Sequence, residues 1–247
     1  MTEGNEIPGQ AGNDGRKPGM TVNKNMIKIK VIISGYGKMG HMVEKELQAR
    51  GIELVQASED IAATPKEMAK ECVCIDFTTP DAFKSNYKFI AQNFKAAVVG
   101  TTGWNDIKDQ VIAAFQQAGT PMIYASNFSL GVNALEAAIA KASKLLKGAG
   151  YTAKIEEVHH IHKLDAPSGT AKTMAEIVEA ELGVTPEITS IREGEVPGIH
   201  TLELTSGCDK ITLRHEAFSR EGLAKGAVVA ATMTETITGV HEFGSLL

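Results

Sequence analysis

The sequence contains no run of basic residues, and its formal net charge is −5 over 247 residues. This acidic balance argues against nucleic acids and anionic membranes as partners. No apolar stretch approaches the length that a bilayer requires, so no membrane association is predicted. The composition, 43% hydrophobic and 22% charged, is typical of a soluble, cytoplasmic, globular protein with one large or two modest domains.

Cysteine is scarce as well, with three residues in the whole chain. Cys72 and Cys74 fall on one face of an apolar strand pattern. An odd and small number of cysteines in such a pattern predicts reduced core residues rather than a disulfide framework or a metal site.

The first 26 residues lack apolar periodicity and are rich in Gly, Asn and Pro. A segment of this composition buries too little surface to offset the entropy of ordering, so residues 1–26 are predicted to be a flexible tail. They also lack the apolar core of a signal peptide and the arginines of a transit peptide, which favours a tag or an extended start.

A strand, a glycine turn and a helix are predicted over residues 27–50, where a β-branched run is followed directly by glycines. Such glycines permit a tight turn and a close approach of the backbone to a pyrophosphate, which the helix N-terminus then binds. Any α/β protein can place glycines after a strand, so this motif alone is weak. The predicted cofactor-binding residues here are Gly35, Tyr36, Gly37, Lys38, Met39 and Gly40.

A second short strand over 53–57 ends at Glu59 and Asp60, about twenty residues beyond the glycines. An acid at this place binds the ribose hydroxyls of NADH, and Glu59 is the predicted contact. Lys38 in the glycine turn could instead meet the 2′-phosphate of NADPH. The sequence therefore leaves the choice between NADH and NADPH open.

Three further strands are predicted at 73–77, 96–99 and 122–125, separated by helical patterns at 81–93 and 106–118. Strands that alternate with helices predict a doubly wound parallel sheet of the Rossmann type over residues 27–128, and such sheets bind ligands at the carboxyl ends of their strands. The residues predicted to flank the nicotinamide are Gly100, Thr101, Thr102, Ser126, Asn127 and Phe128.

The pattern changes after residue 129. One long helix leads into strands at 152–160, 187–192, 200–206 and 210–218, with a second helix beginning near residue 168. Adjacent strands with only two helices predict an α+β domain with an open mixed sheet. Residues 129–228 are therefore expected to form a substrate-binding and oligomerisation domain, with 229–247 packing back on the first domain.

Three histidines and a lysine lie within five residues at the end of the predicted strand 152–160. Because neighbouring residues of a strand point to opposite faces, His159 and His160 are expected to serve different tasks. Imidazole is the commonest proton-transfer group, and Lys163 adds an amine. A metal cluster is disfavoured, because adjacent strand residues diverge, no nearby Cys or acid completes the set, and Lys163 would repel a cation. A merely solvated role for these side chains is the remaining alternative.

The helix after this segment has the signature of an anion site. Ser168 is the predicted N-cap residue, so the amides of Gly169 and Thr170 face outward. A helix N-terminus attracts a carboxylate or a phosphate, and glycine allows it to approach closely. We therefore expect an anionic substrate beside His159 and Lys163.

Together these segments resemble the 4-hydroxy-tetrahydrodipicolinate reductase (dihydrodipicolinate reductase) family of diaminopimelate and lysine biosynthesis. The resemblance is carried by the residues 35–40, 76–78, 99–103, 126–129, 159–171, 196–200 and 218–220. It implies hydride transfer from NADH or NADPH to a small cyclic dicarboxylate imine, with loss of water, in a homotetramer assembled through the second domain. It also implies that His159 is the acid/base residue, Lys163 the proton donor and His160 a substrate ligand, with Ser168, Gly169 and Thr170 cradling a carboxylate.

Two alternatives compete with this interpretation. Another NAD(P)-dependent oxidoreductase would explain the glycine turn but not Lys163 followed by the helix start at Ser168. A non-catalytic dinucleotide sensor would not require His159 or Lys163 at all, since a fold alone never fixes function.

Overall fold

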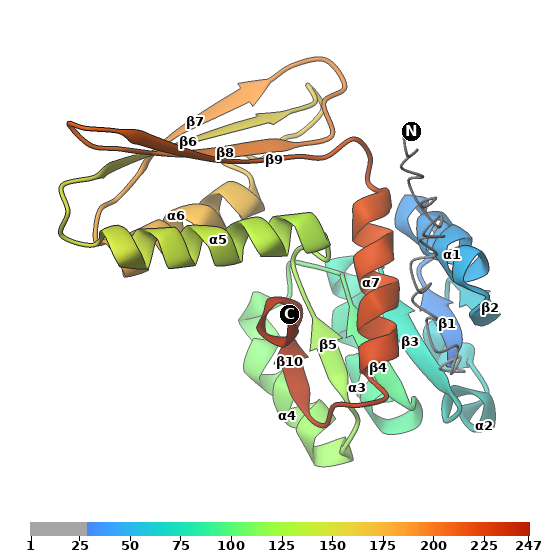
Figure 1. Cartoon of the computed structure of the whole chain (residues 1–247). Helices are drawn as coiled ribbons and strands as arrows, with labels where there is room; N and C mark the ends of the chain where they lie inside the picture. The colour runs from blue at the N-terminus through green and yellow to red at the C-terminus, as the bar shows by residue number, and fades with distance from the viewer. Residues whose placement is uncertain (1–28) are drawn as a thin grey trace, which may run out of the picture.

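The computed structural model describes residues 29–247, and the predicted tail 1–26 lies outside them. Two sheets form the framework, each with its own hydrophobic core, and the long helix α5 lies beneath the smaller one (Figure 1). No helix in the described part of the chain is long and apolar enough to cross a membrane.

The first sheet has six parallel strands in the order β10-β5-β4-β3-β1-β2. Its inner strands are buried on both faces, which explains why they appear in the sequence as continuous apolar runs rather than as alternating patterns. The bounds are β1 Lys30–Ser34, β2 Glu53–Ser58, β3 Cys72–Asp76, β4 Ala96–Val99, β5 Met122–Tyr124 and β10 Val240–Glu242.

Helices cover both faces of this sheet. On one face α1 (Lys38–Arg50) and α7 (Glu221–Met233) pack over side chains such as Val31 and Val73, and on the other α3 (Pro80–Asn93) and α4 (Lys108–Ala118) pack over Ile32 and both buried cysteines. A short helix α2 (Lys66–Ala69) precedes β3. This three-layer arrangement confirms the predicted doubly wound parallel sheet.

The second sheet is mixed and four-stranded, in the order β7-β6-β8-β9. β6 (Thr152–His159) runs parallel to β7 (Glu187–Arg192) and antiparallel to β8 (Ile199–Thr205), which pairs with β9 (Lys210–Glu216). Helices α5 (Leu130–Leu146) and α6 (Gly169–Leu182) pack on one face, and no helix of residues 29–247 covers the other (Figure 1). The predicted α+β domain with an open mixed sheet is confirmed.

The C-terminal segment contains two elements that the sequence did not reveal. Helix α7 begins at Glu221 and inserts Ala224, Ala227 and Ala231 into the core of the first sheet, and β10 then pairs with β5. Alanine and glycine give α7 a weak apolar periodicity, although small side chains are what a helix needs to approach other backbone closely. The chain thus returns to the first sheet about eight residues before the predicted position 229.

Candidate functional site

A cavity of about 460 Å³ lies where the two domains meet. It brings together side chains from the carboxyl ends of β4 and β5 with the loop after β6, the N-terminus of α6 and the start of α7. The predicted residues that line it are Thr102, Ser126, Asn127, His159, His160, Lys163, Ser168, Gly169 and Thr170. Residues from both predicted ligand sites therefore face one space.

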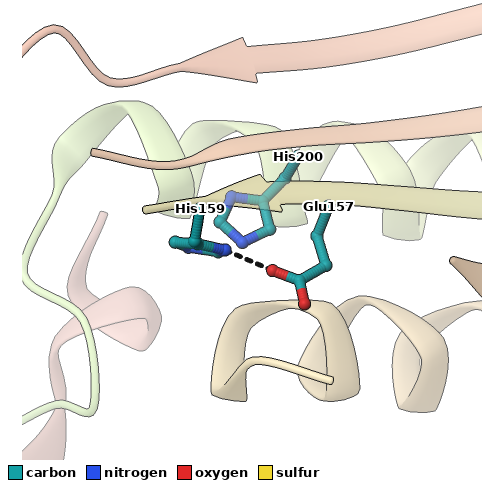
Figure 2. A group of neighbouring side chains, drawn as sticks. All are labelled: Glu157, His159 and His200. Carbon is teal, nitrogen blue, oxygen red and sulfur yellow. Dashed lines mark hydrogen bonds and ion pairs between the residues drawn. The ribbon is translucent and has the colours of Figure 1, made fainter. Parts of the chain in front are cut away.

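A carboxylate and imidazole pair supports this cavity: His159 lines it, and the buried Glu157 lies behind His159 (Figure 2). Glu157 and His159 are two residues apart on β6, so both point to the sheet face that the helices cover, and Glu157 Oε2 hydrogen-bonds to His159 Nδ1. The other oxygen of Glu157 accepts from Arg192 at 2.9 Å and from the Ser168 amide at 3.3 Å. Glu157 was not among the predicted site residues, although the spacing Glu-x-His within a strand is a signal for such a pair.

Burial and charge set the protonation of this pair. Burial acts to raise the pKa of Glu157, but hydrogen bonds from Arg192 and Ser190 outweigh it and hold the pKa below its usual range. Burial lowers the pKa of His159, and the carboxylate of Glu157 acts in the opposite direction but does not outweigh burial. Because the pKa of His159 is lowered on balance, the structure favours an ionised Glu157 beside a neutral His159 near neutral pH, and this ring can accept a proton.

His200 on β8 completes the wall. Its ring lies 5.0 Å from that of His159, edge to face, and its Nε2 is 3.2 Å from Ser168 Oγ. Burial lowers the pKa of His200 to about 4, with the charge of His159 adding to the effect, so His200 is neutral near pH 7. A neutral ring can pack against His159 without repelling its protonated form.

Glu157, His159 and His200 also place one ligand atom each within 4.8 Å of one another, which is the geometry of a metal site. The expectation that no nearby acid completes such a set is wrong, because Glu157 lies only two residues before His159, and the pairing of β6 with β8 adds His200. However, the carboxylate already holds Arg192 and the Ser168 amide. A metal ion would compete with these donors, so we interpret the group as a hydrogen-bonded cluster.

His159 and His160 were expected to point to opposite faces of a strand, and this expectation is wrong. Strand β6 ends at His159, so the alternation of faces stops there, and His160 lines the same cavity. Its Nε2 lies 3.3 Å from an amino group of Arg220, which directly precedes α7. Lys163 forms an ion pair with Asp165 at 2.8 Å. Arg220, which the sequence analysis did not select, adds a cation to the cavity wall.

The N-terminus of α6 has the predicted form. Ser168 is its N-cap residue and accepts from the Ala171 amide at 3.2 Å, which confirms the predicted helix start. An added Cβ at Gly169 would meet nothing within 4 Å, so this helix end is open to a ligand. Thr170 Oγ1 accepts from Asn127 Nδ2 at 3.3 Å, a bond that joins the two domains.

The glycine turn lies apart from this cavity, at the N-terminus of α1. An added Cβ at Gly37 would meet nothing within 4 Å, whereas one at Gly40 would lie 2.5 Å from the Gly35 carbonyl oxygen. The turn is therefore tightly packed at Gly40, whereas the space beside Gly37 is open. Gly37 is the N-cap residue and offers no side-chain bond to the first amides of α1, which leaves them for a phosphate.

Glu59 lies at the same place, just beyond β2. Its carboxylate accepts from the Tyr36 amide at 3.3 Å, so the acid that was predicted to bind a ribose is beside the turn. This arrangement fits the adenosine half of a dinucleotide.

Comparison with known proteins identifies the family. The family model described as the N-terminus of dihydrodipicolinate reductase matches residues 29–128, and the model of its C-terminus matches residues 131–247. The chain belongs to the dihydrodipicolinate reductase family.

The relatives support this membership along nearly the whole chain. A 4-hydroxy-tetrahydrodipicolinate reductase of Christiangramia forsetii is 37% identical over 235 residues, covering 88% of this chain and 97% of the relative. Another of Archaeoglobus fulgidus is 35% identical over 241 residues, covering 82% and 93%. A dipicolinate-bound dihydrodipicolinate reductase from Paenisporosarcina sp. TG-14 shares the fold, with a TM-score of 0.76, 22% identity and coverage of 89% of this chain and 100% of that structure.

Three of the residues predicted to contact the cofactor lie in or against the packed interior of this family member. Thr101 is buried and donates to Asp76 Oδ1 at 2.5 Å, and a Cβ at Gly100 would lie 2.1 Å from the ring of Phe77. Phe128 is buried against Phe77 and against Phe243 of the C-terminal segment. Their part in cofactor binding stays a prediction, and any direct contact would come from their backbone.

A second cavity, of about 340 Å³, adjoins Ser126 and Asn127 and is lined by Glu136 of α5 and Glu242 of β10. Burial raises the pKa of Glu136 to about 7, and the carboxylate of Glu242 adds to the shift. A carboxyl whose pKa is raised on folding stabilises the native state below its unfolded pKa of about 4.5, and this stabilisation is lost as the pH rises towards 7.

We expect Glu136→Gln to raise the free energy of unfolding by about 1–2 kcal/mol at pH 8, after allowance for partial exposure of the group, and by much less at pH 5. Thermal unfolding of both proteins at the two pH values measures this difference. An equal gain at both pH values would mean that packing, rather than charge, causes it.

Proposed function

We propose that this chain reduces 4-hydroxy-tetrahydrodipicolinate to tetrahydrodipicolinate, with loss of water, at the expense of NADH or NADPH, in diaminopimelate and lysine biosynthesis. Family membership supports the reaction. The observation that carries it most strongly is that His159, Lys163 and the open N-terminus of α6 line one cavity together with the loops after β4 and β5. Those loops belong to the sheet edge that binds nicotinamide in doubly wound folds.

The substrate in this proposal is a dianion, and the cavity offers two places for its carboxylates. The amides of Gly169 and Thr170 at the start of α6 bind one carboxylate, with the Thr170 hydroxyl beside them and Ser168 holding the helix end. The guanidinium of Arg220, at the start of α7 and beside His160, offers a positive charge for the second carboxylate. Two fixed sites of this kind would orient the ring between the catalytic side chains and the first domain.

We assign proton transfer to Lys163 and His159, which line the cavity between the two carboxylate-binding regions. A bound NADH or NADPH supplies the hydride. Hydride addition to a conjugated imine builds negative charge on the ring, and Lys163 neutralises it with its ammonium group and donates a proton. His159 gives or takes a proton at the atom that faces the cavity, which also assists the loss of water.

For the nucleotide, we propose that the amides at the start of α1 bind the pyrophosphate and that Glu59 binds the adenosine ribose. Glu59 favours NADH, and Lys38 in the same turn offers a cation to the 2′-phosphate of NADPH. Both nucleotides are therefore expected to serve as hydride donors.

The proposal is tested by a coupled assay with the purified full chain. Dihydrodipicolinate synthase generates the substrate in place from pyruvate and aspartate semialdehyde, and nucleotide oxidation is followed by absorbance. Oxidation that depends on this substrate establishes the reductase, and the ratio of rates with NADH and NADPH gives the preference. Nucleotide binding without oxidation would favour a different oxidoreductase or a dinucleotide sensor.

We also propose that the chain is a homotetramer assembled through the uncovered face of the second sheet. This face carries exposed residues of both charges, including Lys154, Glu156 and Arg214. Light scattering is expected to give about four times the chain mass of 26.3 kDa, and Arg214→Glu is expected to lower it by placing like charges at the interface. A monomeric wild-type protein would contradict this assembly.

A further inference from the structure

We propose that Glu157 is a positioning residue that fixes the tautomer and the orientation of His159 and joins this side chain to the carboxylate-binding end of α6. The inference rests on the proposed function, in which His159 transfers a proton at the cavity. Glu157 itself is fully buried and does not line the cavity, so it acts through His159.

The two oxygens of Glu157 have different partners. Oε1 accepts from Arg192 at 2.9 Å and from the Ser168 amide at 3.3 Å, and both of these groups can only donate. Oε2 faces His159 Nδ1. An ionised carboxylate only accepts, so Nδ1 must carry the hydrogen, and the lone pair of the neutral ring is then on Nε2.

His159 Nε2 lies beside Gly198, which has no side chain to cover it. An added Cβ at Gly198 would lie 3.1 Å from Nε2 and 3.3 Å from Cδ2, closer than ordinary packing contact. His159 and Gly198 both line the cavity, and the lack of a side chain at Gly198 keeps the space beside Nε2 free of a Cβ. The tautomer that Glu157 imposes is therefore the one that offers an acceptor to a substrate, and the protonated ring donates from the same atom.

The same carboxylate also fixes the loop between β6 and α6. Its acceptance from the Ser168 amide ties β6 to the N-cap residue of α6, while Arg192 donates to the carbonyl oxygens of Lys163 and Asp165 at 3.3 and 2.5 Å. Proton donor, acid/base residue and anion-binding helix end thus share one hydrogen-bonded support. The Arg192 guanidinium balances the buried charge, which would otherwise be costly.

The variant Glu157→Gln tests the tautomer directly, because its side chain has one acceptor oxygen and one donor NH₂ group in place of the two acceptor oxygens of the carboxylate. Arg192 and the Ser168 amide both donate to the position of Oε1, which therefore takes the carbonyl oxygen of glutamine. The NH₂ group then faces His159 Nδ1 and donates to it. This moves the ring hydrogen to Nε2, where it blocks the acceptor that the cavity requires.

The first experiment measures kinetics in the full chain. Glu157→Gln is expected to lower kcat by about 10²–10⁴-fold, as the wrong tautomer does in other acid/base sites, with KM changed by less than about threefold. Glu157→Asp keeps the charge and is expected to recover at least about tenfold of the lost rate. Glu179→Gln, which removes an exposed carboxylate on α6 away from the cavity, is the matched control and should behave as wild type.

The second experiment reads the ring itself and needs no turnover. Nitrogen NMR of the ¹⁵N-histidine-labelled chain at pH 8, with His159 assigned from the spectrum of His159→Gln, should show the hydrogen on Nδ1 in wild type and on Nε2 in Glu157→Gln. Hydrogen on Nε2 in the wild type, or an unchanged kcat in Glu157→Gln, would overturn the inference. Should the reductase assay fail while the tautomer is as expected, the proposed function is wrong and the positioning role stands.

Discussion

His159→Gln and Lys163→Ala are each expected to lower kcat by about 10²–10⁴-fold while nucleotide affinity changes by less than about twofold. Both side chains line the cavity between the domains, whereas the glycine turn of α1 does not. Removal of either should therefore abolish proton transfer and leave the nucleotide site intact. Steady-state kinetics in the coupled assay and fluorescence titration with NADH measure the two quantities separately.

Lys144→Ala is the control for this pair, since Lys144 is exposed on α5 and is not part of the cavity wall. It should keep wild-type kcat. A double variant of His159 and Lys163 is expected to lose less than the product of the single effects, because the two groups act on one charge. Turnover within tenfold of wild type in both single variants would contradict the assigned roles.

Gly226→Ala is expected to destabilise the fold by about 3 kcal/mol and to lower Tm by roughly 10 °C, the second large effect. Gly226 is in the middle of α7, and an added Cβ would lie 1.6 Å from the carbonyl oxygen of Phe128. That oxygen belongs to backbone, which cannot rotate away as a side chain would. The helix would have to move away from the loop between β5 and α5, which also lines the cavity.

The matched control is Gly222→Ala, one turn earlier in the same helix. The nearest atom to an added Cβ there is Ser129 Oγ at 3.7 Å, an ordinary contact. Alanine is the better helix former by up to about 1 kcal/mol, so Tm should stay level or rise slightly. Thermal unfolding followed by circular dichroism separates the two variants. Equal Tm values would mean that α7 can shift without cost and that the close approach to Phe128 is unimportant.

The sequence by itself determined the elements whose signals are local. Strand β4 at Ala96–Val99 falls where the pattern predicts it because a buried strand is a short apolar run, and strand β7 at Glu187–Arg192 does so because a partly exposed strand is rich in β-branched residues. The Ser168 cap was predictable for the same reason, since the capping bond joins residues only three positions apart. The alternation of strands and helices then determined the parallel sheet of the first domain.

The last segment shows where local signals fail. Helix α7 presents alanines and glycines to the first sheet, so no strong apolar stripe marks it, and β10 is a strand of only three residues. The position of such elements depends on the surface they cover, which exists only after β1 to β5 have paired.

The tertiary structure alone decided the composition of the site. Glu157, Arg192 and His200 meet because β6 pairs with β7 on one side and β8 on the other, so residues 35 and 43 positions apart become neighbours. Arg220 reaches His160 only because the chain returns to the first domain. The sequence predicted the side chains of residues 159–170 that line the cavity, since they are concentrated in one segment. Glu157 lies on the same strand as His159, but Arg192, His200 and Arg220 come from β7, β8 and the start of α7, and only long-range contacts bring these three to the site.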